Sequence, residues 1–138
     1  MKIKLQQVID AVEQADDNWT GFYDTHTGET VWQGDRFFDD DYGETAELIE
    51  TSGNRFYRFP TKFDIHEYSI MEDFVDNFPS GAIRNELMNA IHGRGAFRRF
   101  KDTLYRYGIE QSWYDYQAEA YKQIAIRWCR DEGLEYEE

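Results

Sequence analysis

Residues 93–102 read GRGAFRRFKD, and this stretch closes one predicted helix and opens another. Glycine tolerates the left-handed backbone that commonly ends a helix, so Gly93 fits the position just after a helix C-terminus. The next helix is predicted from about 96 to 107, with Gly108 as its end. Helical spacing predicts the residues on its inward stripe, which are Phe97, Phe100 and Leu104.

Further helices are predicted on both sides of this stretch. Asp64 and Glu67 form a capping-box-like pair, which predicts the start of a helix that Pro79 ends. Its inward residues are predicted to be Tyr68, Met71, Phe74, Val75 and Phe78. Another helix is expected between Pro79 and Gly93. Ser112 is expected to cap the last helix, and the tail after Gly133 is expected to fray.

The N-terminal part of the chain predicts a helix and a β-hairpin. Apolar residues at helical spacing predict the helix over 4–15. Residues 19–24 and 30–33 predict two strands around a turn at Gly28. A short helix is expected near 45–51, followed by a short strand that Pro60 ends.

These elements predict an α+β fold. An N-terminal helix, a β-hairpin and a short strand are expected to pack on a helical C-terminal lobe of about four helices. The length of 138 residues fits a single domain, 1–138, or two lobes over 1–60 and 61–138. Ten Phe, ten Tyr and four Trp can fill a large core, so a disordered acidic chain is excluded.

The charge of the chain is unevenly distributed. The formal net charge is −13. Residues 10–50 carry 13 acids and one base, a net charge of −12, whereas residues 84–106 carry six bases and two acids, a net charge of +4. Most of the surface would repel a nucleic-acid duplex, so duplex binding is not expected.

The cysteine content and the N-terminus predict a cytoplasmic protein. Cys129 is the only cysteine, which excludes an intramolecular disulfide and fits a reducing compartment. The first residues lack the apolar run of a signal peptide. No window approaches the apolar length that spans a bilayer, so no membrane partner is expected.

Four blocks of this sequence resemble a bacterial protein family without a known activity. The blocks read YDTHTGETV, PTKFDIHEYSIMEDFV and GRGAFRRFKDTL, and the last runs SWYDY, AEAY and IRWC with gaps between them. The resemblance covers most of the chain and implies a bacterial cytoplasmic protein. It implies no catalytic residues, because the family supplies none.

The candidate site lies in the basic stretch and consists of Arg94, Arg98, Arg99 and Lys101. One interpretation is an anion site, because the free amides and dipole of a helix N-terminus favour a phosphate or carboxylate beside Arg94. The other is structural, with these cations paired to the chain's own carboxylates. A Walker loop is excluded, because no Gly-Lys-Ser/Thr follows the glycines.

Other motifs predict no catalytic or metal site. HEYSIME at His66 lacks the second histidine of a zinc-protease helix. The acidic run from Asp35 to Asp41 lacks the ligand spacing of a calcium loop, which favours a solvated face. Arg127 and Arg130 flank Cys129 in sequence, but a structural cysteine is favoured over a nucleophile. The sequence therefore predicts no cofactor and no metal.

The leading hypothesis for function is a non-enzymatic cytoplasmic module that binds another protein. It rests on the lack of a catalytic constellation, the many aromatic residues and the segregated charge. The first alternative is a protein or enzyme that binds a small anion or phosphate ligand in an arginine pocket. The second is a nucleic-acid-related role, through the basic helix or as an acidic competitor for DNA-binding proteins.

Overall fold

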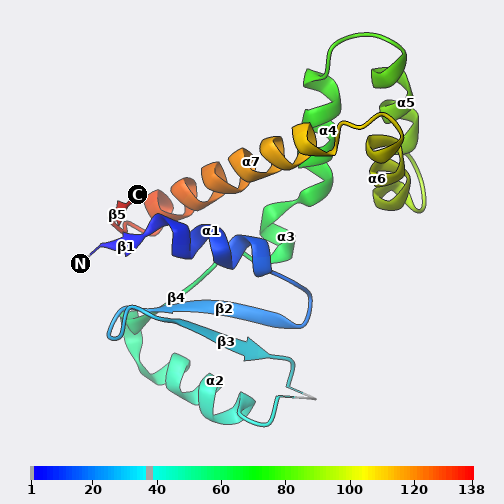
Figure 1. Cartoon of the computed structure of the whole chain (residues 1–138). Helices are drawn as coiled ribbons and strands as arrows, with labels where there is room; N and C mark the ends of the chain where they lie inside the picture. The colour runs from blue at the N-terminus through cyan, green and yellow to red at the C-terminus, as the bar shows by residue number, and fades with distance from the viewer. Residues whose placement is uncertain (1, 37–38) are drawn as a thin grey trace. The chain divides into compact units, whose positions relative to one another are not determined.

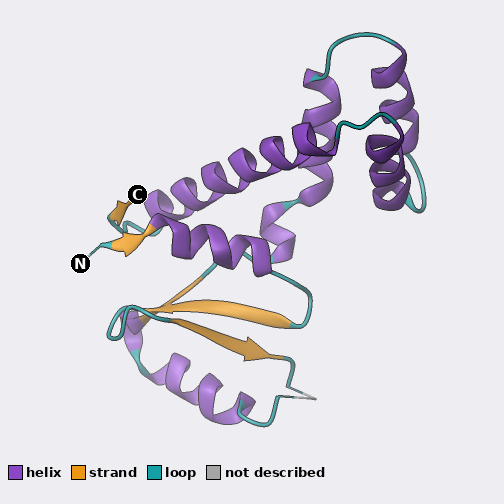
Figure 2. Ribbon diagram, in the orientation of Figure 1, coloured by secondary structure: helices purple, strands orange, loops and turns teal. Residues whose placement is uncertain are grey.

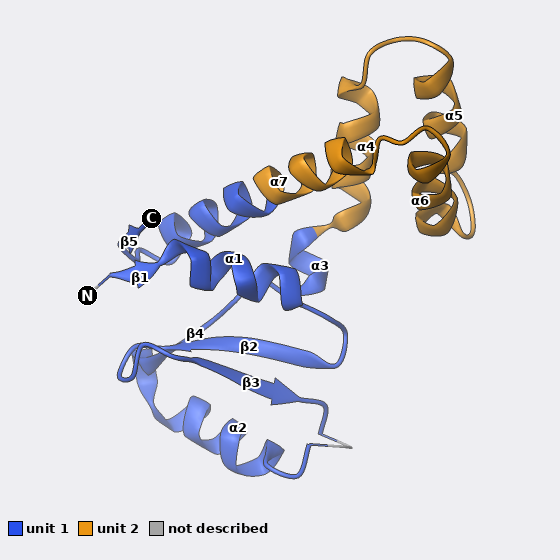
Figure 3. Cartoon of the chain, viewed as in Figure 1, with its two compact units in different colours: residues 1–65, 121–138 blue, residues 66–120 orange. Residues whose placement is uncertain are grey.

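The computed structural model describes residues 2–36 and 39–138 (Figure 1). It contains helices and two small sheets, which confirms the predicted α+β class. The chain forms two compact units, residues 1–65 with 121–138 and residues 66–120 (Figure 3). The first unit holds β1 (Ile3–Lys4), α1 (Leu5–Gln14), β2 (Trp19–Asp24), β3 (Thr30–Gly34), α2 (Tyr42–Thr51), η1 (Gly53–Arg55), β4 (Phe56–Arg58), α3 (Lys62–Ile65) and β5 (Tyr136–Glu137). The second unit holds α4 (Glu67–Asn77), α5 (Ala82–Ala90) and α6 (Ala96–Arg106), whereas α7 (Glu110–Asp131) begins in the second unit and ends in the first.

The larger sheet has the strand order β3-β2-β4, and both neighbouring pairs are antiparallel (Figure 2). The predicted hairpin of β2 and β3 is present, and its turn contains Gly28 at a φ of +75°. A Cβ on Gly21 of β2 would lie 3.0 Å from the Trp32 ring and 3.2 Å from the Phe59 ring. A larger residue there would have to displace these rings, so this close approach requires glycine.

One hydrophobic core in the first unit joins β1, α1, β2, the residue after β4 and the C-terminal part of α7. Its buried members are Ile3, Leu5, Val8, Ala11, Tyr23, Phe59, Ala125, Trp128 and Cys129. The rings of Phe59 and Trp128 lie 5.0 Å apart, and the Trp128 indole N–H donates to the carbonyl of Arg58 at 2.9 Å. The C-terminal part of α7 therefore packs with the N-terminal elements. This grouping differs from the predicted lobes 1–60 and 61–138, because Trp128 and its neighbours complete the N-terminal core.

An aromatic cluster forms the core of the second unit. The ring centroid of Phe74 lies between 5.4 and 6.0 Å from those of Phe78, Phe100, Trp113 and Tyr116. The contacts with the last three rings are edge-to-face, an arrangement that aromatic quadrupoles favour. This cluster joins α4, α6 and the first part of α7.

The helix starts differ from two predictions. Thr61 rather than Asp64 begins the capping box: its N–H donates to Asp64 Oδ2 at 3.0 Å, and the Asp64 N–H donates to Thr61 Oγ1 at 3.2 Å. This pair starts the short helix α3, and α4 begins after His66, which has a φ of +54°. The prediction that Ser112 caps the last helix is wrong, because α7 already begins at Glu110.

The C-terminal tail is ordered by strand pairing. Tyr136 and Glu137 form β5, which pairs in parallel with Ile3 and Lys4 of β1. The prediction that this tail frays is therefore wrong. The cause is a tertiary contact, because a two-residue strand has no local signal and depends on its partner at the other end of the chain.

Two residues predicted to face inward are partly exposed. Tyr68 is 37% exposed, and its hydroxyl donates to the carbonyl of Ile91 at 2.6 Å. Phe97 is 46% exposed, whereas Phe100 and Leu104 on the same predicted stripe are buried. The acidic run predicted from Asp35 includes residues 37 and 38, which lie outside the described residues.

Candidate functional site

The helix α6 has two different faces. Successive residues of a helix are about 100° apart, so Ala96, Phe100, Thr103 and Leu104 fall on one arc. All four are buried, with at most 7% of each residue exposed. Phe97 lies at the edge of this arc, where spacing alone does not tell a buried position from an open one. Its predicted burial is wrong for this reason.

Basic and aromatic side chains share the outward side of α6. Arg98 and Lys101 are exposed, and Tyr105 is 80% exposed. Together with Phe97 they lie within about 100° of arc around the helix. Arg94 is also exposed and lies in the loop just before the helix. We call these five residues the basic-aromatic face of α6.

The cations of the basic-aromatic face have no carboxylate partner in the described part of the chain. No ion pair involves Arg94, Arg98 or Lys101 over residues 2–36 and 39–138. Asp102 is exposed and follows Lys101, and it makes no ion pair with these cations. Within the described ranges, these three residues therefore form none of the internal ion pairs considered from the sequence.

Arg99, the fourth predicted site residue, binds the backbone instead. Its Nε donates to the carbonyl of Ala90 at 3.2 Å, and its two terminal nitrogens donate to the carbonyls of His92 and Arg94. Ala90 is the last residue of α5, where the helix dipole favours a cation, and His92 and Arg94 lie in the loop between α5 and α6. Arg99 therefore fixes the loop that carries Arg94, and the structure does not bring all four predicted residues to one point.

In the first unit, Arg55 is paired with the buried carboxylate of Asp24. The Nε and one terminal nitrogen of Arg55 donate to the two carboxylate oxygens of Asp24, both at 2.9 Å. Asp24 is 3% exposed and also accepts the N–H of His26 at 2.9 Å. The hydrogen bonds from Arg55, supported by that of His26, hold the pKa of Asp24 well below its usual range.

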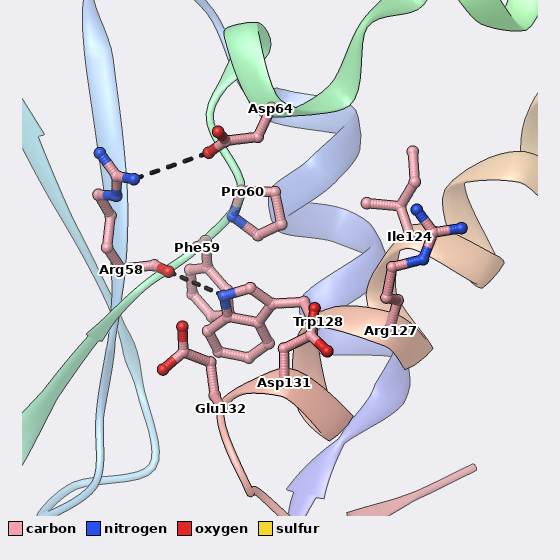
Figure 4. Close-up of a pocket in the computed structure, with 9 residues that line it drawn as sticks. All are labelled: Arg58, Phe59, Pro60, Asp64, Ile124, Arg127, Trp128, Asp131 and Glu132. Atoms are coloured by element: carbon pink, nitrogen blue, oxygen red, sulfur yellow. Dashed lines mark hydrogen bonds and ion pairs between the residues drawn. The ribbon is translucent and has the colours of Figure 1, made fainter.

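The first unit also contains a cavity of about 300 Å³ beside Trp128 (Figure 4). One wall comes from the segment 58–64 and the other from the last two turns of α7. Arg58 on the first wall lies 3.8 Å from Asp64. No local sequence pattern predicts this cavity, because only the fold brings the end of α7 to the segment 58–64.

The other candidate chemistries lack a suitable geometry. Cys129 is fully buried, and burial raises the pKa of its thiol, the opposite of what an activated nucleophile needs. Over residues 2–36 and 39–138, no three His, Cys, Asp or Glu side chains cluster as metal ligands. Within the same ranges, every helix is too short or too polar to cross a bilayer.

Comparisons with known proteins agree with the resemblance stated from the four sequence blocks. The model of the uncharacterised protein family UPF0158 matches residues 1–137. UPF0158 protein PA5073 of Pseudomonas aeruginosa is 27% identical over 93 residues, which cover 67% of this chain and 61% of that relative. The match thus spans less than two thirds of the relative's length. No solved structure matches the chain. The chain belongs to the uncharacterised protein family UPF0158.

Proposed function

We propose that the chain is a non-enzymatic module that binds an acidic segment of a partner protein on the basic-aromatic face of α6. The observation that carries this proposal is the chemistry of that face. Three cations of this face have no carboxylate partner among residues 2–36 and 39–138, and the face also carries Phe97 and Tyr105, which are 46% and 80% exposed. The opposite side of the same helix is buried and holds the face in place.

Each part of the face has a role in such a complex. Tyrosine and arginine are enriched among the few residues that supply most of the binding energy in protein interfaces. The cations would attract carboxylates, and Arg98 can bind one in a bidentate manner. The chain as a whole has a net charge of −13, which would repel an acidic partner elsewhere on the surface. Long-range repulsion combined with local attraction would favour one docking position.

Two alternatives have weaker support. A small-anion pocket needs converging arginines, yet Arg99 is engaged with backbone carbonyls. A nucleic acid carries a charge on every residue, so the net charge of −13 would repel the part of it beyond this face more than it repels a short acidic segment, although Phe97 and Tyr105 could stack on unpaired bases. We place the binding in the bacterial cytoplasm, in keeping with the free thiol of the buried Cys129.

The proposal is tested by fluorescence anisotropy with a labelled acidic peptide built from glutamate and leucine. The wild type is expected to bind it at low salt and to lose binding as salt rises, because the attraction between exposed charges is screened. The variant Arg98→Glu/Lys101→Glu is expected to weaken binding by at least about tenfold, which corresponds to about 1.4 kcal/mol. A partner captured from lysate would then be purified and measured with the same variants.

The matched control is Lys62→Glu/Arg130→Glu, which makes the same change in charge at two exposed positions in the other unit. Equal loss of binding in both variants would contradict the proposal, because net charge alone would then explain the effect. Stronger binding of a single-stranded RNA or of inorganic phosphate than of the peptide, lost in Arg98→Glu/Lys101→Glu, would favour one of the alternatives.

A further inference from the structure

The cavity beside Trp128 has the size and lining of a small-molecule site. Its volume of about 300 Å³ is at the lower end of the range that holds small organic ligands. We propose that it binds a small zwitterion with an apolar or aromatic body, of the class of the free α-amino acids. This site is independent of the basic-aromatic face, because its lining residues all belong to the first unit.

The apolar part of the cavity would hold the body of the ligand. Phe59, Pro60, Ile124 and Trp128 contribute to its lining, and Figure 4 shows the Trp128 indole against the Phe59 ring. The indole N–H is already used, because it donates to the carbonyl of Arg58 at 2.9 Å. The indole therefore offers a ligand its ring and no hydrogen-bond donor. Polar recognition must come from the charged residues of the rim.

The rim carries carboxylates that no cation neutralises. Asp131 and Glu132 line the cavity, and no ion pair or side-chain hydrogen bond involves either of them in the described part of the chain. Both lie at the C-terminal end of α7, where the helix dipole adds to the negative potential. An ammonium group is the ligand group that this end of the cavity favours, and the Trp128 ring would support it through a cation–π contact.

The same rim carries a cation, Arg127, that has no carboxylate partner in the part of the chain that the structure describes. Arg127 lies one turn before Asp131, but the two make no ion pair, and Figure 4 shows its guanidinium turned away from the Asp131 carboxylate. Arg58, the other cation of the rim, already has a carboxylate partner, because its Nη2 lies 3.8 Å from Oδ2 of Asp64. Unpaired charges of both signs around one apolar cavity point to a ligand that carries both an ammonium and a carboxylate group.

Isothermal titration with three related probes tests this assignment. The probes are phenylalanine, phenethylamine and phenylpropionate, which share the aromatic ring and differ in charge. Phenylalanine is expected to bind at least about tenfold more tightly than either singly charged probe, because each loses one charge-assisted contact. Arg127→Gln should remove the preference for phenylalanine over phenethylamine. Asp131→Asn/Glu132→Gln should remove the preference over phenylpropionate.

Two further variants complete the test. Arg130→Gln changes an exposed arginine of the same helix that is not among the lining residues, and it should bind all three probes as the wild type does. Ile124→Trp should abolish binding of all three probes by filling the cavity, with thermal melts confirming that every variant folds. No binding of phenylalanine to the wild type at millimolar concentration would overturn the proposal. Equal losses in Arg127→Gln and Arg130→Gln would also overturn it.

Discussion

The Asp24–Arg55 pair of the first unit and the basic-aromatic face of the second use their cations in opposite ways. In the first unit, Arg55 gives two hydrogen bonds to the buried carboxylate of Asp24, and its charge is neutralised inside the fold. In the second unit, Arg98 and Lys101 are exposed and form no ion pair within the described residues. The comparison indicates that the first arrangement stabilises the fold, whereas the second is free to bind. Substitutions in the two regions should therefore separate stability from binding.

The largest expected effect distinguishes the two faces of α6. Phe100→Ala should lower the free energy of unfolding by about 3–5 kcal/mol, because it leaves a cavity in the aromatic cluster. Phe97→Ala should lower it by less than about 1 kcal/mol, because the ring is 46% exposed. Urea unfolding of both variants measures the difference. Equal losses would show that the assignment of the two faces is wrong.

The buried ion pair should have the next largest effect on stability. Asp24→Ala should lower the free energy of unfolding by about 3 kcal/mol, because it removes the carboxylate that accepts hydrogen bonds from Arg55 and His26. Binding of the acidic peptide should stay unchanged at a temperature where the variant is folded. Chemical denaturation and anisotropy on the same sample check both statements. An unchanged unfolding midpoint would contradict the structural role of the pair.

The same pair predicts how stability depends on pH. The pKa of Asp24 is lowered by folding, so its contribution is present above the usual carboxyl pKa of about 3.9 and is lost as pH falls below that value. Between about pH 6 and pH 3, the wild type should lose more stability than Asp24→Asn, which cannot titrate at this position. Urea unfolding of both proteins at pH 6 and at pH 3 measures the two losses of stability. Equal losses would show that the Asp24 carboxylate does not contribute to the pH dependence.

A smaller effect is expected at Arg99. Arg99→Ala should lower the free energy of unfolding by about 1–2 kcal/mol, because three backbone carbonyls lose a charged donor. Arg99→Lys should restore only part of this, since an ammonium group lacks the planar fork of a guanidinium. Thermal melts of the wild type, Arg99→Ala and Arg99→Lys compare their stabilities. If Arg99→Ala is as stable as the wild type, the loop before α6 does not depend on this side chain.

Local patterns predicted most of the secondary structure. Helical spacing identified Phe100 and Leu104 as buried, and the turn at Gly28 identified the hairpin. Spacing could not decide the position of Phe97, because a residue at the edge of a stripe is buried only if a neighbouring element covers it. The pairing of Tyr136 with Ile3 was invisible for a similar reason, since it joins the two ends of the chain.

The candidate site was predictable only in part. The composition of the stretch 93–102 identified the basic residues, and all four are exposed, although Arg99 donates its hydrogen bonds to backbone carbonyls. The role of Arg99 depends on backbone carbonyls, which the sequence does not display. The pair of Asp24 and Arg55 joins residues 31 positions apart, and no local pattern connects them. Tertiary contacts therefore decided which cations hold the fold.

Chemical-shift mapping tests the central claim most directly. The isotope-labelled protein is titrated with the acidic peptide, and the backbone amide shifts are followed. We expect the largest shifts at Phe97, Arg98, Lys101 and Tyr105, and none at the Asp24–Arg55 pair. Shifts spread over both units, or largest outside α6 and the loop before it, would contradict the account.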